Sequence, residues 1–260
     1  MPNKFLRLIS ASVLACAVLL PGVATAIPVT QTLTVQVYQL CDDAGQNCSS
    51  TGPSGNSYFA TETNKIWAQA GISVLFNFVQ QINSTFFSTI NDLAGNSLFN
   101  LGQTYTPGSN LSSTVVNLFL VHSINGGTAY GEGWIGVGGL AIDMDLVSAF
   151  NGGIGRIDTI AHELGHNLGL VPNSLGGSNA HSTVPNYLMA GGNIRLVPGS
   201  LNDIAPDGLG YDFLPADQIA LAQRSSLLQD VALNNVPEPS SLALLAAGLL
   251  VLAWRRRSRA

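Results

Sequence analysis

The chain has 260 residues, which is enough for one sizeable domain or two small ones. Hydrophobic residues make up 46% and charged residues only 10%, a composition that excludes a disordered acidic or basic chain. Between residues 27 and 236 there are four basic and fourteen acidic residues, a formal charge of −10. A surface that acidic repels phosphate, which argues against nucleic-acid binding.

The first 26 residues have the pattern of a secretory signal peptide. Lys4 and Arg7 precede an apolar run, and the small residues Ala24-Thr25-Ala26 follow it. The alternative is a buried N-terminal helix, which the Ala-x-Ala ending disfavours. We therefore predict removal by signal peptidase, export, and a mature chain that starts near Ile27.

The body begins with a predicted strand and a pair of cysteines. Apolar and polar residues alternate over residues 32–40, as they do in a half-buried strand. Cys41 and Cys48 follow, and export would place them in an oxidising compartment, which favours a disulfide between them. A two-cysteine metal site is the alternative, disfavoured because no histidine lies nearby in the sequence.

A helix and two strands are predicted next. Residues 57–70 have helical character, with Gly71 as the stop. Residues 72–79 and 115–121 are strand candidates, and the second is almost continuously apolar and hence central in a sheet. Between them, residues 91–114 are rich in Gly, Asn, Ser and Thr, which predicts a long surface loop. The inner face of the helix would comprise Phe59, Ile66 and Trp67.

A glycine-rich segment and three further elements complete the body. Residues 126–139 contain seven glycines, which indicates an irregular or edge segment with accessible backbone. Another strand is predicted over residues 140–146. Two helices are predicted after it, one over residues 156–168 that ends at Gly169 and a last one over residues 214–233. This order of elements predicts an α+β fold around one core.

Two acids in the strand predicted over residues 140–146 raise the question of calcium. Asp143 and Asp145 could supply oxygen ligands to Ca²⁺, but no dense loop of such ligands surrounds them. Solvated acids at the end of a strand are the preferred interpretation, and calcium binding is retained as the alternative.

The segment His162-Glu163-Leu164-Gly165-His166 carries the main chemical signal. On a helix, residues i and i+4 share a face, so His162 and His166 can bind one metal ion. Glu163 lies next to the first of them and can reach a water on the metal without being a ligand. Zinc lowers the pKa of such a water to about 7, so Glu163 would act as general base and then pass the proton to a leaving amine. Two histidines without a metal are the alternative.

A catalytic zinc usually has three protein ligands. No glutamate occurs between Glu163 and Glu238. This excludes the class of proteases in which the third zinc ligand is a glutamate on a following helix. His181 is the single downstream histidine and is the predicted third ligand. His122 precedes the motif at the end of a strand and is interpreted as a structural or surface residue. The more distant acids retained as alternatives are Asp203, Asp207 and Asp212.

These residues resemble a known family. The segment from His162 to Gly169 is similar to the zinc motif of the metzincin metallopeptidases, of the matrixin and reprolysin-like kind. The resemblance implies a twisted, mostly parallel sheet with an active-site helix, and a smaller C-terminal subdomain that ends in a helix. In that family a methionine lies in a tight turn beneath the metal. Residues 187–191 resemble this turn, which makes Met189 its methionine; a methionine that merely fills the core is the alternative.

One position departs from the family pattern. The third ligand is expected three residues after Gly169, where this chain has Pro172, and proline cannot bind zinc. His181 would then act after an inserted loop, residues 173–180, similar to the longer insertion of leishmanolysin-like members. The resemblance also suggests that the glycine-rich segment, residues 126–139, pairs with an extended peptide substrate.

The C-terminal residues have a separate organisation. Val236-Pro237-Glu238-Pro239 precedes the apolar run 242–254, and arginines 255–257 follow. The run is shorter than the about 20 residues of a comfortable transmembrane helix, but it could enter a bilayer transiently with the arginines on the cytoplasmic side. An ordinary core helix is the alternative. The tail resembles the PEP-CTERM sorting signal of Gram-negative bacteria, which implies removal by an exosortase and delivery to the cell surface or extracellular matrix.

The sequence thus predicts a signal peptide (1–26), a zinc metallopeptidase domain (27–233) and a sorting tail (234–260). The predicted function is that of an exported zinc metalloendopeptidase, with Glu163 as the catalytic base. The alternative from another class is a non-catalytic matrix or adhesion protein on a metzincin-like fold, which Pro172 and the tail favour. Retention of Glu163 favours the enzyme, because a structural zinc site has no use for that carboxylate. Another amide hydrolase with the same motif is a third interpretation.

Overall fold

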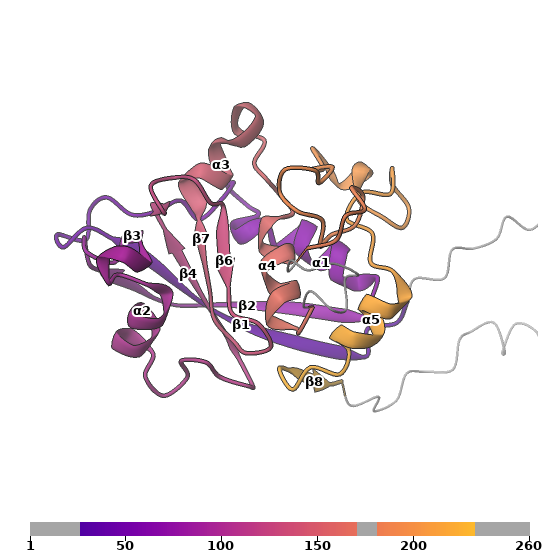
Figure 1. Ribbon diagram of the computed structural model, residues 1–260, viewed down its shortest axis with the longest axis horizontal. Coiled ribbons are helices and arrows are strands. Elements are labelled where there is room, and N and C mark those ends of the chain that lie inside the picture. Colours follow the sequence, from indigo (N-terminus) through magenta and orange to yellow (C-terminus); the bar gives the residue numbers. More distant parts are fainter. Residues whose placement is uncertain (1–26, 171–180, 232–260) are drawn as a thin grey trace, which may run out of the picture.

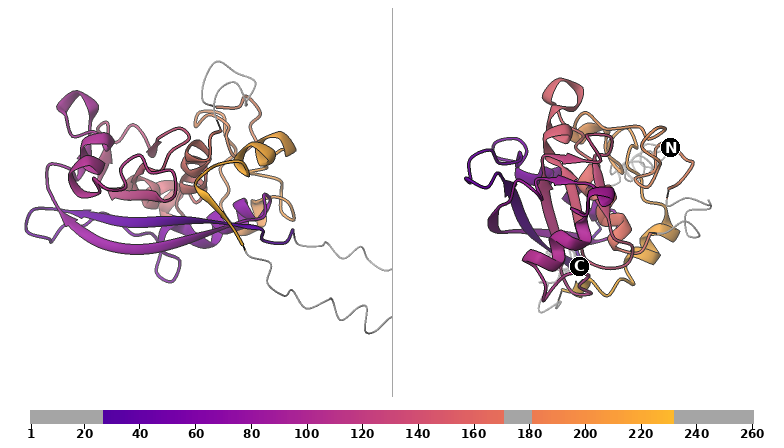
Figure 2. Two further views of the ribbon diagram at one scale, coloured as in Figure 1. Left: turned by 90° about the horizontal axis from the view of Figure 1, so that it is seen from below. Right: turned by 60° about the vertical axis from the view of Figure 1, so that its left-hand side comes forward.

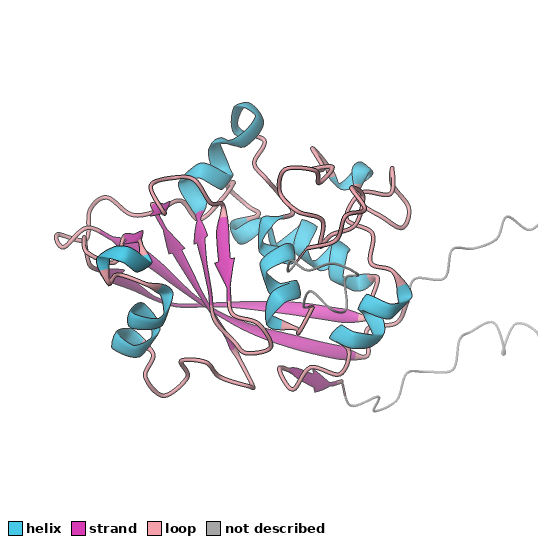
Figure 3. Ribbon diagram, in the orientation of Figure 1, coloured by secondary structure: helices cyan, strands magenta, loops and turns pink. Residues whose placement is uncertain are grey.

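The computed structural model describes residues 27–170 and 181–231. The predicted signal peptide, Pro172 with the loop after it, and the sorting tail lie outside the described residues. The strands are β1 (Gln31–Cys41), β2 (Ile72–Asn83), β3 (Thr89–Ile90), β4 (Val116–Val121), β5 (Ser123–Ile124), β6 (Gly131–Gly133), β7 (Leu140–Asp143) and β8 (Leu228–Asp230). The helices, cyan in Figure 3, are α1 (Ala60–Ala68), α2 (Leu98–Tyr105), α3 (Met144–Gly153), α4 (Thr159–Asn167) and α5 (Ala216–Ala222).

A mixed, mostly parallel sheet lies at the centre of the described chain (Figure 1). Its order is β2-β1-β4-β7-β6, and β8 pairs with the start of β1. The pairs β1–β2, β1–β4 and β4–β7 are parallel, whereas β6 runs antiparallel to β7. Figure 2 shows the two longest strands, β1 and β2, curving together along the molecule. The predicted strands over residues 32–40, 72–79 and 115–121 are confirmed, and β4 is central and fully buried.

Each face of the sheet is covered by helices, because parallel strands bury both faces. Leu33, Val35 and Val37 of β1 alternate towards one face and pack in the core that contains residues of α1 and α4. On the other face, Phe119 of β4 packs in a second core with Leu101 of α2. Figure 1 accordingly shows α2 well apart from α1, α4 and α5.

The first predicted helix is confirmed. Phe59, Ile66 and Trp67 are buried, and Gly71 follows α1 with a left-handed backbone (φ +68°), which glycine adopts readily. Trp67 Nε1 also donates a hydrogen bond to the Ala161 carbonyl at 3.3 Å. This contact fixes α1 against α4, the helix that carries both motif histidines.

The prediction of a loop over residues 91–114 was wrong, because this segment contains α2. The Ser97 side chain accepts a hydrogen bond from Asn100 N and caps the helix, and Leu98 and Leu101 are buried. Two apolar contacts with the second core therefore stabilise a helix whose composition otherwise resembles a loop.

Three other boundaries also differ from the predictions. The strand predicted over residues 140–146 ends at Asp143, whose carboxylate accepts a hydrogen bond from Leu146 N and caps α3. The helix predicted over residues 214–233 ends at Ala222, and β8 follows because its backbone pairs with β1. The predicted helix over residues 156–168 begins at Thr159.

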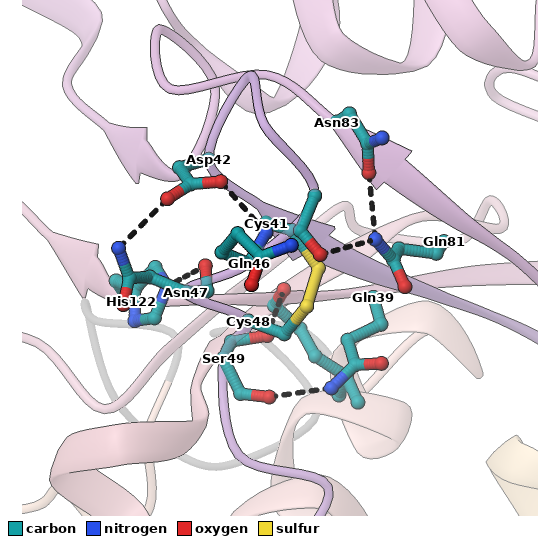
Figure 4. Close-up of a disulfide and its surroundings, with 12 residues drawn as sticks. Gln39, Cys41, Asp42, Gln46, Asn47, Cys48, Ser49, Gln81, Asn83 and His122 are labelled. Carbon is teal, nitrogen blue, oxygen red and sulfur yellow. Dashed lines mark hydrogen bonds between the residues drawn. A yellow bond between two sulfur atoms is a disulfide. The ribbon is translucent and has the colours of Figure 1, made fainter.

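Cys41 and Cys48 are joined by a disulfide (Figure 4), so neither sulfur is free for the alternative two-cysteine metal site. Asp42 orders the short loop between them: its carboxylate accepts from Gln46 N at 2.8 Å and from Asn47 Nδ2 at 2.7 Å. The loop is therefore closed both covalently and by hydrogen bonds.

No helix within residues 27–170 and 181–231 has the length and apolarity needed to cross a bilayer. The predicted transient membrane segment belongs to the tail and is not described.

The contribution of α2 can be tested with two leucines of contrasting burial. Leu101 is 0% exposed and Leu93 is 100% exposed. We expect Leu101→Ala to lower the free energy of unfolding by about 2–5 kcal/mol, because it leaves a cavity in the second core. Leu93→Ala should change it by less than about 0.5 kcal/mol. Urea denaturation measures both; equal effects would contradict the assignment of α2 as a core element.

Candidate metal centre

The helix α4 places two histidines and a glutamate in the interior. His162, Glu163 and His166 are all less than 9% exposed. The helix ends as predicted at Gly169 (φ +89°), where Gly169 N donates to His166 O and Leu170 N donates to Gly165 O. This is a Schellman ending, which turns the chain back under the last helical turn.

His181 joins the two helical histidines. One ring nitrogen from each of the three lies within 4.8 Å of the others, and the ring centroids are 5.0–5.3 Å apart. In the described part of the chain, this is the one group of three or more His, Cys, Asp or Glu residues arranged so that it could hold a metal ion. The structure therefore brings together the three residues that the sequence proposes as ligands.

Backbone carbonyls orient the two helical rings. His162 Nδ1 donates to the Leu188 carbonyl at 2.7 Å, and His166 Nδ1 donates to the Leu170 carbonyl at 3.3 Å. A ring that donates from Nδ1 keeps the lone pair on Nε2, which is the form that binds metal.

Burial sets the charge state of the site. Burial lowers the pKa of His162 well below its usual value, lowers that of His166 to about 4, and lowers that of His181. All three rings are thus neutral at neutral pH, as metal ligands must be. Three neutral imidazoles in a group this tight are a donor set that zinc accepts.

Glu163 responds to the same burial in the opposite direction. Removal from water raises the pKa of its carboxyl to about 7. A carboxyl with this pKa exchanges a proton near neutral pH. Glu163 also lines a cavity of about 190 Å³ together with His162 and His181.

Met189 lies directly beneath α4. It is fully buried, and a Cβ added to Gly165 would lie only 2.4 Å from Met189 Sδ. Ala190 N donates to Tyr187 O in a tight turn, and Ser182 N donates to Met189 O, which holds the residue after His181 against this turn. The turn and the third histidine are therefore positioned together.

A buried ion pair that the sequence patterns do not predict supports the same turn. Arg195 Nε lies 2.8 Å from Asp158 Oδ2, and Arg195 Nη1 donates to the Leu188 carbonyl at 3.3 Å. Asp158 O in turn accepts from His162 N in the first turn of α4. The sequence contained one signal for this pair, because Arg156 and Arg195 are two of only four basic residues between residues 27 and 236.

The glycine-rich segment packs against α4 and forms the edge strand β6, as predicted. A Cβ at Gly131 would lie 2.7–2.9 Å from the Glu163 side chain, so only glycine fits there without displacing that carboxylate. Asn167, also missed, is 0% exposed and donates from Nδ2 to the carbonyls of Trp134, Val137 and Gly139. These bonds fasten the β6–β7 connection to the helix.

His122 lies outside the cluster. Its Nδ1 pairs with Asp145 Oδ2, and its Nε2 bonds the Asn47 carbonyl at 3.0 Å, beside the disulfide loop (Figure 4). Asp145 also accepts from Ser50 N, while Asp143 caps α3. Both aspartates considered for calcium thus have protein partners.

The aspartates considered as a third ligand also lie outside the cluster. Asp203 forms a capping box with Ser200, and Asp207 pairs with Lys65 at 2.7 Å. Asp212 is buried but is not part of the histidine group.

Comparison with known proteins identifies one end of the chain. Residues 235–257 match the PEP-CTERM protein-sorting motif. The motif implies export, sorting to the cell surface in Gram-negative bacteria, and processing by an exosortase-type enzyme. The prediction of a PEP-CTERM sorting signal is therefore confirmed, whereas the match does not bear on the predicted membrane segment of the tail.

For the body, the comparisons are much less informative. No curated protein matches the chain. Among solved structures, it is similar to one titled "Structure of a chaperone-substrate complex" (18% identity, TM-score 0.44), covering 76% of this chain and 34% of that one. It is also similar to metalloproteinase-II from Bacteroides fragilis (15% identity, TM-score 0.38), covering 64% and 48%. The chain spans less than half of either structure, and similarities at this level carry no argument about function.

The pairing of His122 with Asp145 predicts a pH-dependent contribution to stability. Burial opposes the charged ring, but the Asn47 carbonyl and the Asp145 carboxylate outweigh it and raise the pKa of His122. The contribution is therefore complete below the unfolded pKa of about 6.5 and is lost as the pH rises through the folded value. We expect His122→Gln to cost about 0.5–1 kcal/mol more at pH 5 than at pH 9 in urea denaturation. Asp145→Asn should reduce the same pH dependence, because the Asn47 carbonyl remains. Equal costs of His122→Gln at both pH values would contradict the pairing.

Proposed function

We propose that the protein is an exported zinc-dependent metalloendopeptidase with a metzincin-like catalytic domain over residues 27–233. In this proposal signal peptidase removes residues 1–26. The observation that carries it is the placement of Glu163 beside the grouped rings of His162, His166 and His181, all lining or adjoining one cavity. A tight histidine group alone would suit a structural metal, whereas a buried acid at its side suits hydrolysis.

The three histidines would hold the metal through the ring nitrogens that point towards one another. Zinc bound there would supply a Lewis acid that polarises a peptide carbonyl and makes water more acidic. The Leu188 and Leu170 carbonyls would keep the rings of His162 and His166 in the ligating tautomer. Met189 would support the group from below, as in the metzincin turn.

Glu163 would carry the proton in both halves of the reaction. Its carboxylate accepts a proton from the attacking water and then donates it to the nitrogen of the leaving amine. A pKa of about 7 suits both transfers near neutral pH, because the group gives and takes a proton at similar cost. Gly131 would keep this carboxylate in place, since any side chain there would collide with it.

The edge strand β6 would bind the substrate backbone. It is the last strand in the sheet order, and its outer edge adjoins the cavity through Tyr130 and Gly131. An extended peptide can add to such an edge by backbone hydrogen bonds, which recognise the chain without regard to its side chains. This arrangement favours a peptide over other amides.

The second candidate function is a non-catalytic matrix or adhesion protein on the same fold, and the sorting motif favours it. Glu163 argues against it. Its carboxyl is only 8% exposed, and removal from water raises its pKa to about 7, which is a cost to the ionised form. Such a cost is retained where the acid has chemistry to perform.

The two candidates differ in a measurement on four purified proteins. We expect the wild type to bind one zinc per chain and to cleave casein-derived peptides. Glu163→Gln should keep the zinc and lose cleavage by about 10²–10⁴-fold, because proton transfer is removed. His181→Ala should lose the zinc, whereas His122→Ala, a matched change outside the cluster, should keep both properties.

Zinc content by elemental mass spectrometry and peptide cleavage by chromatography provide the readouts. A wild type that binds no zinc, or one that binds it and is as inert as Glu163→Gln across a broad peptide library, would favour the matrix protein.

A further inference from the structure

The cavity beside Glu163 contains an unusual concentration of positive charge. Arg156 and Arg195 both line it, although the body has only four basic residues against fourteen acidic ones. They are 6% and 9% exposed. Buried arginines normally have carboxylate partners, so the first question is how these two are neutralised.

One carboxylate, that of Asp158, lies between the two arginines. It is 0% exposed and close to Arg195, at 2.8 Å from Nε, but its other oxygen is 3.8 Å from Arg156 Nε. Within residues 27–170 and 181–231, Arg156 Nε has no hydrogen-bond partner, and the bond from its Nη2 to the Gly192 carbonyl is long at 3.5 Å. Arg195 Nε also makes no hydrogen bond within these residues, but Arg195 has the closer ion pair and a hydrogen bond to the Leu188 carbonyl. Arg156 lies farther from the carboxylate and keeps unused hydrogen-bond donors.

The other nearby acid does not compensate for Arg156. Asp212 is buried, and burial, reinforced by repulsion from Asp158, raises its pKa well above the usual value. Both arginines lower this pKa, and neither forms an ion pair with Asp212 within residues 27–170 and 181–231. The carboxyl of Glu163 faces the same cavity and is reserved for proton transfer in the proposed mechanism. In the described part of the chain, Asp158 is thus the one carboxylate that forms an ion pair with either guanidinium.

The position of Arg156 leaves it open to a ligand. Its Cζ lies 4.5 Å from the centroid of the Tyr130 ring, whose face holds the planar guanidinium. Gly192 has no side chain that could cover the two terminal Nη groups of Arg156. A Cβ at this position would lie 3.7–3.8 Å from them. An arginine held at its face with free N–H groups is well suited to bind a carboxylate through two hydrogen bonds.

We propose that Arg156, supported by Arg195, binds a carboxylate of the substrate at the residue that supplies the leaving amine. This inference rests on the proposed peptidase function. The side of the scissile bond follows from Glu163, which lines the same cavity and would protonate that amine. The protein would thus cleave preferentially before an acidic residue or before a C-terminal residue with a free carboxylate.

Peptide pairs that differ only in one carboxylate test this preference. One pair carries Glu or the isosteric Gln after the scissile bond, within an amidated peptide; the other ends one residue after it, with a free or an amidated terminus. We expect the zinc-loaded wild type to prefer the carboxylate member of at least one pair by about tenfold or more in kcat/KM, as charge-assisted hydrogen bonds provide. The pair that responds identifies the source of the carboxylate.

Variants then connect the preference to Arg156. In Arg156→Gln the preference should fall to near parity, and Arg156→Lys should keep part of it because the charge remains. Arg224→Gln, which removes an exposed arginine just after α5, should leave it unchanged. Thermal unfolding of each variant identifies loss of folding, and Arg156→Lys keeps the test decisive if Arg156→Gln does not fold. Equal cleavage of both members of each pair by the wild type would overturn the inference.

Binding separates this inference from the proposed function. The fluorescence anisotropy of labelled Glu and Gln peptides is measured with zinc-loaded Glu163→Gln and with the same protein carrying Arg156→Gln. Tighter binding of the Glu peptide that depends on Arg156, without cleavage by the wild type, would uphold the carboxylate site and overturn the peptidase. Cleavage by the wild type without any carboxylate preference would do the opposite.

Discussion

The Leu188 carbonyl oxygen joins the two parts of the chain that form the site. It accepts hydrogen bonds from His162 on α4 and from Arg195, whose ion pair with Asp158 returns to the start of the same helix. The ring of one proposed ligand, the turn at Met189 and the base of the cavity are therefore fixed by one acceptor. Because a buried carbonyl must be paired, any movement of the turn would leave polar groups unsatisfied. The positions of His162, Arg195 and the Met189 turn therefore depend on the hydrogen bonds to the Leu188 carbonyl.

Burial accounts both for the neutral histidine rings and for the raised pKa of Glu163. The interior disfavours charge, which keeps the histidine rings neutral and moves the pKa of Glu163 to about 7. The neutral rings suit metal binding and the raised pKa suits proton transfer, so both properties follow from burial alone. The ion pair between Asp158 and Arg195 is the exception, and it is tolerated because its partners are close.

Local patterns in the sequence predict the parts of the site that depend on local structure. The spacing of His162 and His166 and the stop at Gly169 follow from helix geometry, and His181 follows from the scarcity of histidine. The sequence does not predict Asp158 pairing with Arg195, or Asn167 bonding three carbonyls, since these contacts join distant segments. α2 and β8 are missed for the same reason: a second core stabilises one, and pairing with β1 stabilises the other.

Gly131 shows that the choice of a residue without a functional group can be restricted by a chemically active neighbour. Its α-carbon faces the carboxyl of Glu163, so even the methyl group of alanine would occupy the space of that carboxyl. The space that Glu163 on α4 requires therefore restricts a residue on β6. In the same segment, a Cβ at Gly136 would meet nothing within 4 Å, but the left-handed backbone there (φ +75°) favours glycine. Gly131 is restricted instead by lack of room. Two glycines in one segment are thus retained for unrelated reasons, one by its backbone and the other by its neighbour.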